Sequence, residues 1–307
     1  MNLLSVESVS KRYGDRLLFD DITFGVNKGE RVAFIAKNGS GKSTLLKMLS
    51  GEETSDTGSI VFRNDIKVRF LSQQPTFDEN GTVLDAIFSG DSDLMQAVRR
   101  YEEVMESQDE GDALHDALAD MDKLNAWDYE SKAKQILGKL EIHRFQQKVG
   151  EMSGGQQRRL ALAQVLMEEP DFLILDEPTN HLDIGMIEWL EGYLSNDRFS
   201  LLIVTHDRYF LDNVCNVVIE LANNQIYRYK GNYAYYVEKK AEREVLEQAS
   251  QEKAANQYRK ELEWMRRQPK ARGTKAKARV GAFDDVQSRA KKIRKEESVT
   301  LEVNTTR

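Results

Sequence analysis

The sequence contains a single cysteine, Cys215, and no long run of apolar residues. One cysteine cannot form an intrachain disulfide, which fits a reducing compartment, and we expect Cys215 to be a small buried side chain. The longest apolar runs, residues 172–175 and 201–204, are strand-sized, whereas a membrane-spanning helix needs about 20 apolar residues. Charged residues from Glu7 onward also interrupt the apolar core of any signal peptide. These absences predict a cytoplasmic protein without a membrane domain.

Basic residues are unevenly distributed along the 307 residues. The formal net charge is −7, yet residues 264–295 contain twelve Lys and Arg against two Asp, so the rest of the chain is strongly acidic. The length and the 40% of hydrophobic residues allow one large domain with an appendage. A concentrated basic segment on an acidic body indicates a polyanionic partner for that segment alone.

The pattern of apolar residues predicts an α/β domain. Strands alternate with helices over residues 1–230, which favours a largely parallel sheet, while residues 83–141 become helical and acidic. Strands are expected at residues 3–7, 16–26, 31–35, 172–176 and 200–205, with two more within 58–71, and helices at 42–49, 156–168 and 184–194.

A glycine-rich loop joins the expected strand 31–35 to the expected helix that begins at Lys42. Residues 36–44 form a Walker A loop, although Ala36 takes the place of the usual first glycine and fits there only if its φ is negative. Backbone N–H groups of such a loop surround phosphates, and the helix N-terminus adds partial positive charge. Lys42 should reach the β- and γ-phosphates of ATP, and the Ser43 hydroxyl should ligate Mg²⁺. The other loop residues predicted to bind ATP are Asn38, Gly39, Ser40, Gly41 and Thr44.

Two adjacent carboxylates, Asp176 and Glu177, stand at the end of the buried strand expected at 172–176. This is the Walker B pattern. Asp176 would hold Mg²⁺ through its water shell, and Glu177 would polarise the attacking water as a general base. Together with the Walker A loop, the pair predicts an ATPase that uses Mg·ATP.

Residues 152–157, Met-Ser-Gly-Gly-Gln-Gln, resemble the signature of ATP-binding cassette (ABC) proteins, with Met152 in place of leucine. A serine and two glycines before a helix that begins near Gln156 make a second anion-binding turn. The resemblance implies that this signature binds the γ-phosphate of ATP held by the opposite cassette. The signature residues are Ser153, Gly154, Gly155 and Gln156.

Other ABC motifs follow in the family's order. Gln74 competes with Gln73 for the Q-loop position, and the spacing to Pro75 favours Gln73. The resemblance assigns adenine stacking to Tyr13, sensing of Mg²⁺ and the γ-phosphate to Gln73, the D-loop to Asp183 and the catalytic γ-phosphate switch to His206. It also implies a RecA-like core, an antiparallel β subdomain and an α-helical subdomain.

Residues 177–183, 205–210 and 229–233 are similar to the ABC-F class, and the Uup branch is the nearest match. Proteins of this class carry two cassettes and no membrane domain. The resemblance therefore implies a cassette at 1–232 that pairs with a second cassette or with a copy of itself. Helices within 83–150 resemble a short ABC-F arm, with an enlarged helical subdomain as the alternative reading.

An amphipathic stripe that includes Val237 and Val245 predicts a long helix after the cassette. A matching stripe from Phe283 to Ile293 predicts an antiparallel hairpin at 233–298, which resembles the ABC-F interdomain linker. Residues 299–307 then look like the start of a second cassette that is cut short. Isolated half-sites predict weak hydrolysis at best.

Seven basic residues and no acidic residue occur within 266–279. Such a segment contacts phosphates, and the resemblance implies ribosomal or transfer RNA as the partner. The same residue types suit a DNA-binding ATPase of repair or recombination, and a transporter subunit is the least favoured alternative. The predicted nucleic-acid-binding residues are Arg266, Arg267, Lys270, Arg272, Lys275, Lys277 and Arg279.

Overall fold

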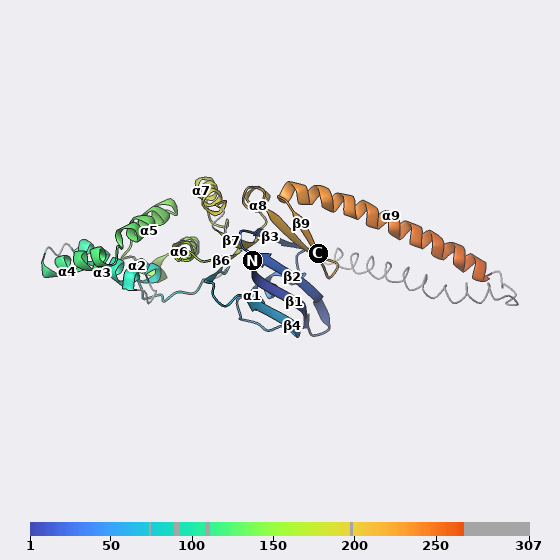
Figure 1. Ribbon diagram of the computed structural model, residues 1–307, viewed down its shortest axis with the longest axis horizontal. Helices are drawn as coiled ribbons and strands as arrows, with labels where there is room; N and C mark the ends of the chain where they lie inside the picture. The colour runs from blue at the N-terminus through green and yellow to red at the C-terminus, as the bar shows by residue number, and fades with distance from the viewer. Residues whose placement is uncertain (74, 89–92, 108–110, 197–198, 267–307) are drawn as a thin grey trace. The chain divides into compact units, whose positions relative to one another are not determined.

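The first compact unit of the chain, Met1–Tyr236, is built on a six-stranded sheet in the order β5-β6-β7-β3-β8-β9 (Figure 1). The computed structural model describes residues 1–73, 75–88, 93–107, 111–196 and 199–266. All neighbouring strands of this sheet are parallel except β8 and β9, which confirms the predicted α/β class. The strands are β3 (Arg31–Ala36), β5 (Val68–Leu71), β6 (Phe172–Asp176), β7 (Ser200–Val204), β8 (Val217–Ala222) and β9 (Gln225–Lys230).

A three-stranded antiparallel sheet, in the order β2-β1-β4, belongs to the same unit. Its strands β1 (Asn2–Tyr13), β2 (Arg16–Asn27) and β4 (Thr57–Phe62) share an apolar core with helix α1 (Lys42–Leu49) and with one face of the large sheet. Phe19, Leu45 and Phe172 are fully buried there and represent the three layers. The first two strands are longer than the sequence pattern predicted.

Strand β6 shows why the apolar run before Asp176 is unbroken. Phe172 and Ile174 pack into the core that contains α1, whereas Leu173 and Leu175 pack into the core that contains the helices. A strand buried on both faces needs apolar side chains at every position. The same packing holds the C-terminal end of β6, where Asp176 is the last strand residue and Glu177 follows it.

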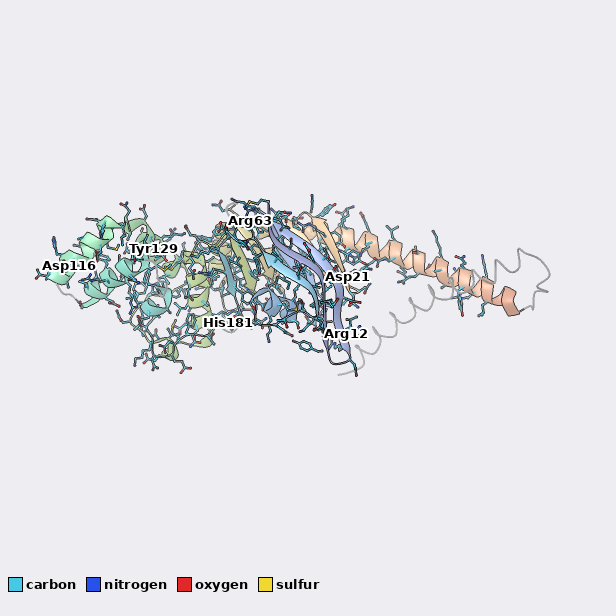
Figure 2. The ribbon with its side chains drawn as sticks, turned by 60° about the horizontal axis from the view of Figure 1, so that its bottom comes forward. Arg12, Asp21, Arg63, Asp116, Tyr129 and His181 are labelled. Carbon is cyan, nitrogen blue, oxygen red and sulfur yellow. The ribbon has the colours of Figure 1, made fainter. Side chains whose placement is uncertain are left out.

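Among the described residues, four α-helices and the short helix η1 lie between β5 and the signature motif, which confirms the predicted α-helical subdomain. Arg100 of α3 pairs with Asp116 and Asp120 of α4, at 3.8 and 3.2 Å, at the end of this subdomain where Figure 2 labels Asp116. Whether these helices form an ABC-F arm stays a prediction. The helices of the unit besides α1 are α2 (Val83–Ile87), α3 (Asp93–Ser107), α4 (Asp112–Lys123), α5 (Trp127–Lys139), η1 (Val149–Glu151), α6 (Gly154–Met167), α7 (Ile184–Leu194) and α8 (Arg208–Val214).

Cys215 ends α8 and is 5% exposed. Burial raises the pKa of its thiol to about 12, so the thiol stays protonated and unreactive at neutral pH. This confirms the prediction that Cys215 is a small buried side chain.

Helix α9 (Tyr233–Arg266) confirms the predicted long helix after the cassette, and a second unit of the chain begins at Val237. Val237 and Val245 of the predicted stripe are 46% and 67% exposed. The matching stripe expected to pack on them lies outside the described residues, so the antiparallel hairpin stays a prediction. None of the described helices is both long and apolar enough to cross a membrane. Several predicted features lie outside the described residues. They are Gln74, six of the seven predicted basic contacts (within residues 267–279), the predicted second helix of the hairpin up to 298 and the expected start of a second cassette at 299–307.

Candidate nucleotide-binding site

The glycine-rich loop leads from β3 into α1 through two residues with left-handed backbone. Gly39 has a φ of 76°, and Gly41, the N-cap of α1, has a φ of 97°. Between them, the backbone N–H and the hydroxyl of Ser40 both donate to the carbonyl of Lys37, at 3.2 and 2.7 Å. None of the described side chains caps α1, so its first N–H groups are available to a phosphate.

Ala36 is compatible with this loop. It is the last residue of β3 and pairs with Leu221 of β8 in parallel register. Its φ is not positive, so the methyl group that replaces the usual glycine hydrogen causes no backbone strain.

Gly41→Ala is expected to damage the loop, because a Cβ there would lie 2.9 Å from Phe19 Cε1 in a left-handed backbone. We expect the free energy of unfolding to fall by about 2 kcal/mol and the affinity for ATP at least about tenfold. Denaturant unfolding and ATP titration measure the two effects. Gly51→Ala is the matched control, because Gly51 has a φ of 81° with nothing within 4 Å of its Cβ. An equal loss of ATP affinity in both variants would contradict a specific role of the loop.

Lys42 and the acidic pair face one another across the site. Burial lowers the pKa of Lys42, and the charges of Glu177 and Asp176 act in the opposite direction. Burial also raises the pKa of Asp176, and the neighbouring charge of Glu177 adds to this rise. Asp176 and Glu177 are only 7% and 8% exposed. A divalent cation beside the pair would relieve the cost of keeping two buried carboxylates ionised.

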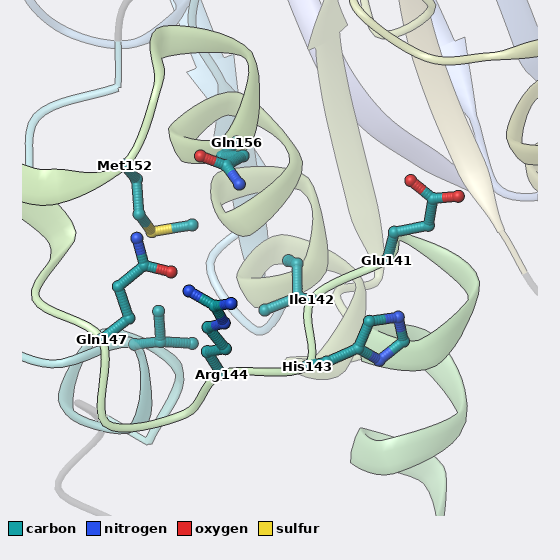
Figure 3. Close-up of a pocket in the computed structure, with 8 residues that line it drawn as sticks. Glu141, Ile142, His143, Arg144, Gln147, Met152 and Gln156 are labelled. Carbon is teal, nitrogen blue, oxygen red and sulfur yellow. The ribbon is translucent and has the colours of Figure 1, made fainter.

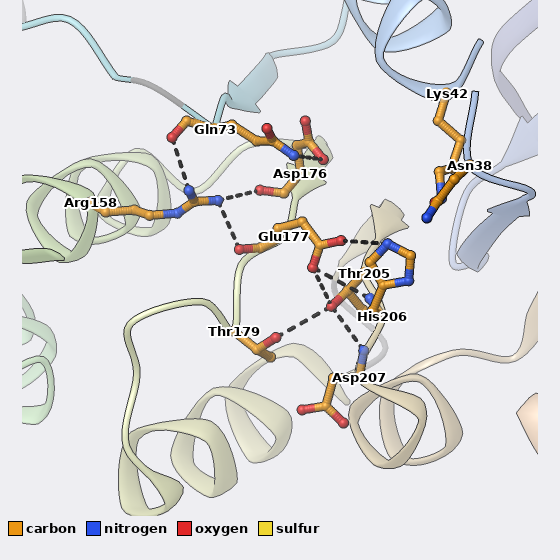
Figure 4. Close-up of polar contacts among 10 residues, drawn as sticks. All are labelled: Asn38, Lys42, Gln73, Arg158, Asp176, Glu177, Thr179, Thr205, His206 and Asp207. Atoms are coloured by element: carbon orange, nitrogen blue, oxygen red, sulfur yellow. Dashed lines mark hydrogen bonds and ion pairs between the residues drawn. The ribbon is translucent and has the colours of Figure 1, made fainter. Parts of the chain in front are cut away.

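Glu177 is held by the segment that follows β7 (Figure 4). Its Oε2 accepts hydrogen bonds from Thr205 Oγ1 at 2.9 Å and from the backbone N–H of His206 at 3.4 Å, and its Oε1 lies 3.6 Å from His206 Nε2. Its φ of 51° is a left-handed conformation that a non-glycine residue adopts at a cost of about 1–3 kcal/mol. The structure therefore brings the two predicted catalytic residues, Glu177 and His206, together. Thr205 was not among the predicted site residues.

The three predicted Mg²⁺ ligands also lie together. Gln73 Nε2 is 3.5 Å from Asp176 Oδ1, and Ser43 lines the same cavity as both side chains. A hydroxyl, an amide oxygen and a carboxylate are the hard oxygen donors that Mg²⁺ prefers, alongside water and phosphate oxygens. Among the described residues no cluster of three His, Cys, Asp or Glu side chains could hold a metal by itself. The residues present thus fit Mg²⁺ bound together with a nucleotide.

These groups surround a cavity of about 450 Å³. This volume lies within the range of about 300–1,000 Å³ that is usual for small-molecule sites. Tyr13 stands at its rim, 52% exposed, with its hydroxyl hydrogen-bonded to Glu53 at 2.5 Å. Arg16, which was not among the predicted site residues, also lines the cavity and donates to the carbonyl of Gly39 at 2.7 Å. The predicted residues that line it are Tyr13, Asn38, Gly39, Gly41, Lys42, Ser43, Thr44, Gln73, Asp176, Glu177 and His206, whereas Ser40 is not among them.

The signature motif does not line this cavity. Ser153 caps α6 in a reciprocal pair with Gln156, with Ser153 N–H to Gln156 Oε1 at 2.9 Å and Gln156 N–H to Ser153 Oγ at 3.3 Å. The helix therefore begins at Gly154, two residues before the predicted start. Met152 and Gln156 line a separate cavity of about 370 Å³ with Arg144 and its neighbours (Figure 3). Within one chain, the signature and the Walker A loop thus belong to different sites.

The D-loop connects the acidic pair to α7. Asp183 caps that helix by accepting a hydrogen bond from Met186 N–H at 2.8 Å. His181, labelled in Figure 2, has a φ of 65° and lies beside Gly155 of the signature. Ile184 is 76% exposed, so the start of α7 presents an apolar side chain to solvent.

The chain matches models of a known protein family, which identifies the family of this site. The family model described as ABC transporter matches residues 19–180, more than half of the chain, and a second model with the same description matches residues 219–303. The chain belongs to the ABC ATP-binding cassette family. Cassettes of this family bind ATP with Mg²⁺ and hydrolyse it, which agrees with the predicted cofactors and activity.

Curated relatives of this cassette protein are ABC-F-like. YfmR of Bacillus subtilis strain 168, described as an uncharacterized ABC transporter ATP-binding protein, is 45% identical over 91% of this chain and 46% of its own length. EttA of Mycobacterium tuberculosis strain H37Rv, an energy-dependent translational throttle protein, is 35% identical over 95% of this chain and 54% of its own length. EttA of Escherichia coli K12 is 34% identical over 89% of this chain and 51% of its own length. The chain spans about half the length of the curated relatives it matches.

Solved structures confirm the cassette fold. An ATP-binding subunit of an ABC transporter superimposes with a TM-score of 0.57 at 22% identity, covering 74% of this chain and 90% of that chain. A nucleotide-free ATP-binding cassette from an ABC transporter gives a TM-score of 0.53 at 22% identity, covering 76% and 92%. At this identity the likeness extends to the fold alone.

Proposed function

We propose that this chain is one cassette, with a basic linker, of an ABC-F-type ATPase that works by closing paired cassettes around ATP. One observation carries the proposal. Lys42, Asp176, Glu177 and His206 converge on one cavity, while the signature at Ser153 lies outside it. A complete site therefore needs the signature of a second cassette or of a second copy of this chain.

The described residues suit hydrolysis of a nucleoside triphosphate. Lys42 and the N-terminus of α1 would hold the phosphates, and Tyr13 would stack on the base. Ser43, Gln73 and Asp176 would hold Mg²⁺, which supplies neutralisation of phosphate charge when it is bound. Glu177 would then orient and deprotonate the attacking water, with its carboxylate fixed by Thr205 and His206.

The exposed ends of two helices support pairing with another cassette. Ile184 and Tyr209, at the starts of α7 and α8, are 76% and 85% exposed. Each follows an aspartate that caps its helix, Asp183 or Asp207, so both side chains are presented by ordered turns. In the proposed pair, the opposite cassette would cover these two side chains.

The proposed polyanion is ribosomal or transfer RNA in the cytoplasm. Two relatives carry the name of a translational throttle protein, which supports a partner in translation. The basic residues within 266–279 would contact the RNA backbone. The same proposal includes a cassette at 1–232, a linker at 233–298 and membership of the Uup branch. Nothing among the described residues favours DNA over RNA, so DNA enters as an outcome of the test.

The test is salt-dependent binding of this chain to ribosomes, transfer RNA and a four-way DNA junction, with and without Mg·ATP. Neutralising the seven basic residues of 266–279 should weaken RNA binding at least about 100-fold at low salt and remove most of its salt dependence. Glutamines at the exposed residues Lys28, Lys123, Lys139 and Lys148 provide a control on the cassette. A preference for the DNA junction would replace RNA by DNA in the proposal, and equal effects of both sets of substitutions would refute a specific linker contact.

A further inference from the structure

Arg158 connects three segments of the nucleotide site through one side chain (Figure 4). It lies in the second turn of α6, five residues after the signature Ser153, and is 9% exposed. Its Nη1 donates to the carbonyl of Gln73 at 2.9 Å. Its Nη2 donates to the carbonyls of Asp176 and Glu177, at 2.8 and 2.9 Å. Two of these acceptor residues are the proposed Mg²⁺ ligands, and the third is the proposed general base.

The acceptors are backbone oxygens, so the contact constrains the chain itself. Hydrogen bonds from a guanidinium are strong in a protein interior, and its planar fork fixes their directions. The side chains of Asp176 and Glu177 leave the same backbone that Arg158 holds. A movement of the N-terminal half of α6 would therefore shift both carboxylates and the Q-loop residue Gln73.

A donor of Arg158 outside these three bonds, its Nε, argues against a role in stability alone. Among the described residues, this buried Nε has no hydrogen-bond partner. A buried arginine selected only for stability is expected to satisfy its donors, because an unpaired buried N–H is costly. The neighbouring Arg159 differs, since its guanidinium pairs at 3.0 Å with Glu141, which is exposed.

We propose that Arg158 is a positioning residue that transmits the position of the signature helix α6 to the Mg²⁺ ligands and general base of the same cassette. This inference rests on the proposed function, in which the signature binds ATP held by the opposite cassette. Docking of α6 onto that ATP then sets the backbone of Gln73, Asp176 and Glu177 in its own cassette. Each of the two paired sites thereby senses whether the other is filled.

The first test measures the link without nucleotide. Arg158→Lys keeps the charge but replaces the planar fork by one ammonium nitrogen. That nitrogen has three N–H donors, but it cannot occupy the two separate positions of Nη1 and Nη2. Amide hydrogen exchange of the 307-residue chain should become at least about fivefold faster at residues 71–73 and 176–180, and stay unchanged at 38–44. Arg159→Lys should change none of these segments. Arg158→Gln serves as the second variant if Arg158→Lys fails to give a folded chain by circular dichroism.

The second test measures ATP affinity with Mg²⁺ and with a chelator. Without Mg²⁺, Arg158→Lys should bind ATP with the affinity of wild type, because the Walker A loop is unchanged. With Mg²⁺, its affinity for ATP should be about tenfold lower than that of wild type. A merely structural role would weaken both affinities alike and would overturn the proposal, as would exchange rates equal to those of wild type. If wild type itself binds no ATP, the proposed function fails, while the exchange comparison still decides whether Arg158 constrains the two segments.

Discussion

Glu177→Gln is expected to lower the rate of ATP hydrolysis about 100-fold or more while leaving ATP bound. A positioned general base contributes about 10²–10⁴ to a rate, and an amide cannot accept the proton of the attacking water. The glutamine side chain has nearly the same shape, and its oxygen can still accept the bonds from Thr205 and His206 that hold the carboxylate in place. Single-turnover hydrolysis and equilibrium ATP titration separate the two effects.

The control for this prediction is another buried carboxylate. Glu102 of α3 is 7% exposed and lies in the helical subdomain, so Glu102→Gln should hydrolyse ATP at nearly the wild-type rate. Under the proposed function, Glu177→Gln with ATP should also stay bound to ribosomes longer than wild type, because a closed pair could not reopen by hydrolysis. Hydrolysis by Glu177→Gln within about threefold of wild type would show that another group acts as the base.

Most of the nucleotide site could be predicted because parallel strands end at one edge of a sheet. The Walker A loop follows β3, the acidic pair lies at the C-terminal end of β6 and His206 follows β7. These strands are neighbours in the sheet. Lys42 and Asp176 are 134 residues apart in the sequence, but strand order alone predicts that they lie close together in space.

Arg158 could not be assigned a role in the same way, because it binds backbone carbonyls, which leave no trace in the sequence of its partners. One signal was present. Arg158 precedes Leu162 and Val165 by four and seven residues, so the helical period places it on a buried face of α6. A buried arginine demands acceptors, and that requirement alone would have marked it.

The packing of α9 could be predicted only in part. Val237 and Val245 share a helical stripe, but a stripe shows only which residues share a face and not whether anything covers it. Tyr236, one residue away, is 2% exposed and donates from its hydroxyl to Glu220 Oε1 at 3.1 Å. Side-chain contacts of the cassette thus decide the buried face at the start of α9.

A mixture of two inactive variants is expected to recover activity if this chain pairs with itself head to tail. Lys42→Ala removes the Walker A lysine, and Ser153→Arg fills the signature turn and removes its cap. Each variant alone should hydrolyse ATP at least about 100-fold more slowly than wild type. In a mixed pair, one site combines both defects and the other combines an intact Walker A loop with an intact signature. Half of the pairs in an equal mixture are mixed, so hydrolysis should return to about a quarter of the wild-type rate.

The double variant Lys42→Ala/Ser153→Arg is the control for this recovery. Mixed with either single variant it offers no intact site, so its mixtures should stay inactive. Recovery in the first mixture alone requires that the two motifs act across an interface between copies, as their separation within one chain implies. Absence of recovery, with wild type active, would mean that one chain completes its own site. If wild type is inactive as well, this chain does not complete a site with its own copy, and a different second cassette is needed. Adding that cassette should restore hydrolysis at both sites of wild type. With Lys42→Ala or Ser153→Arg, the site that contains the substituted residue should stay inactive.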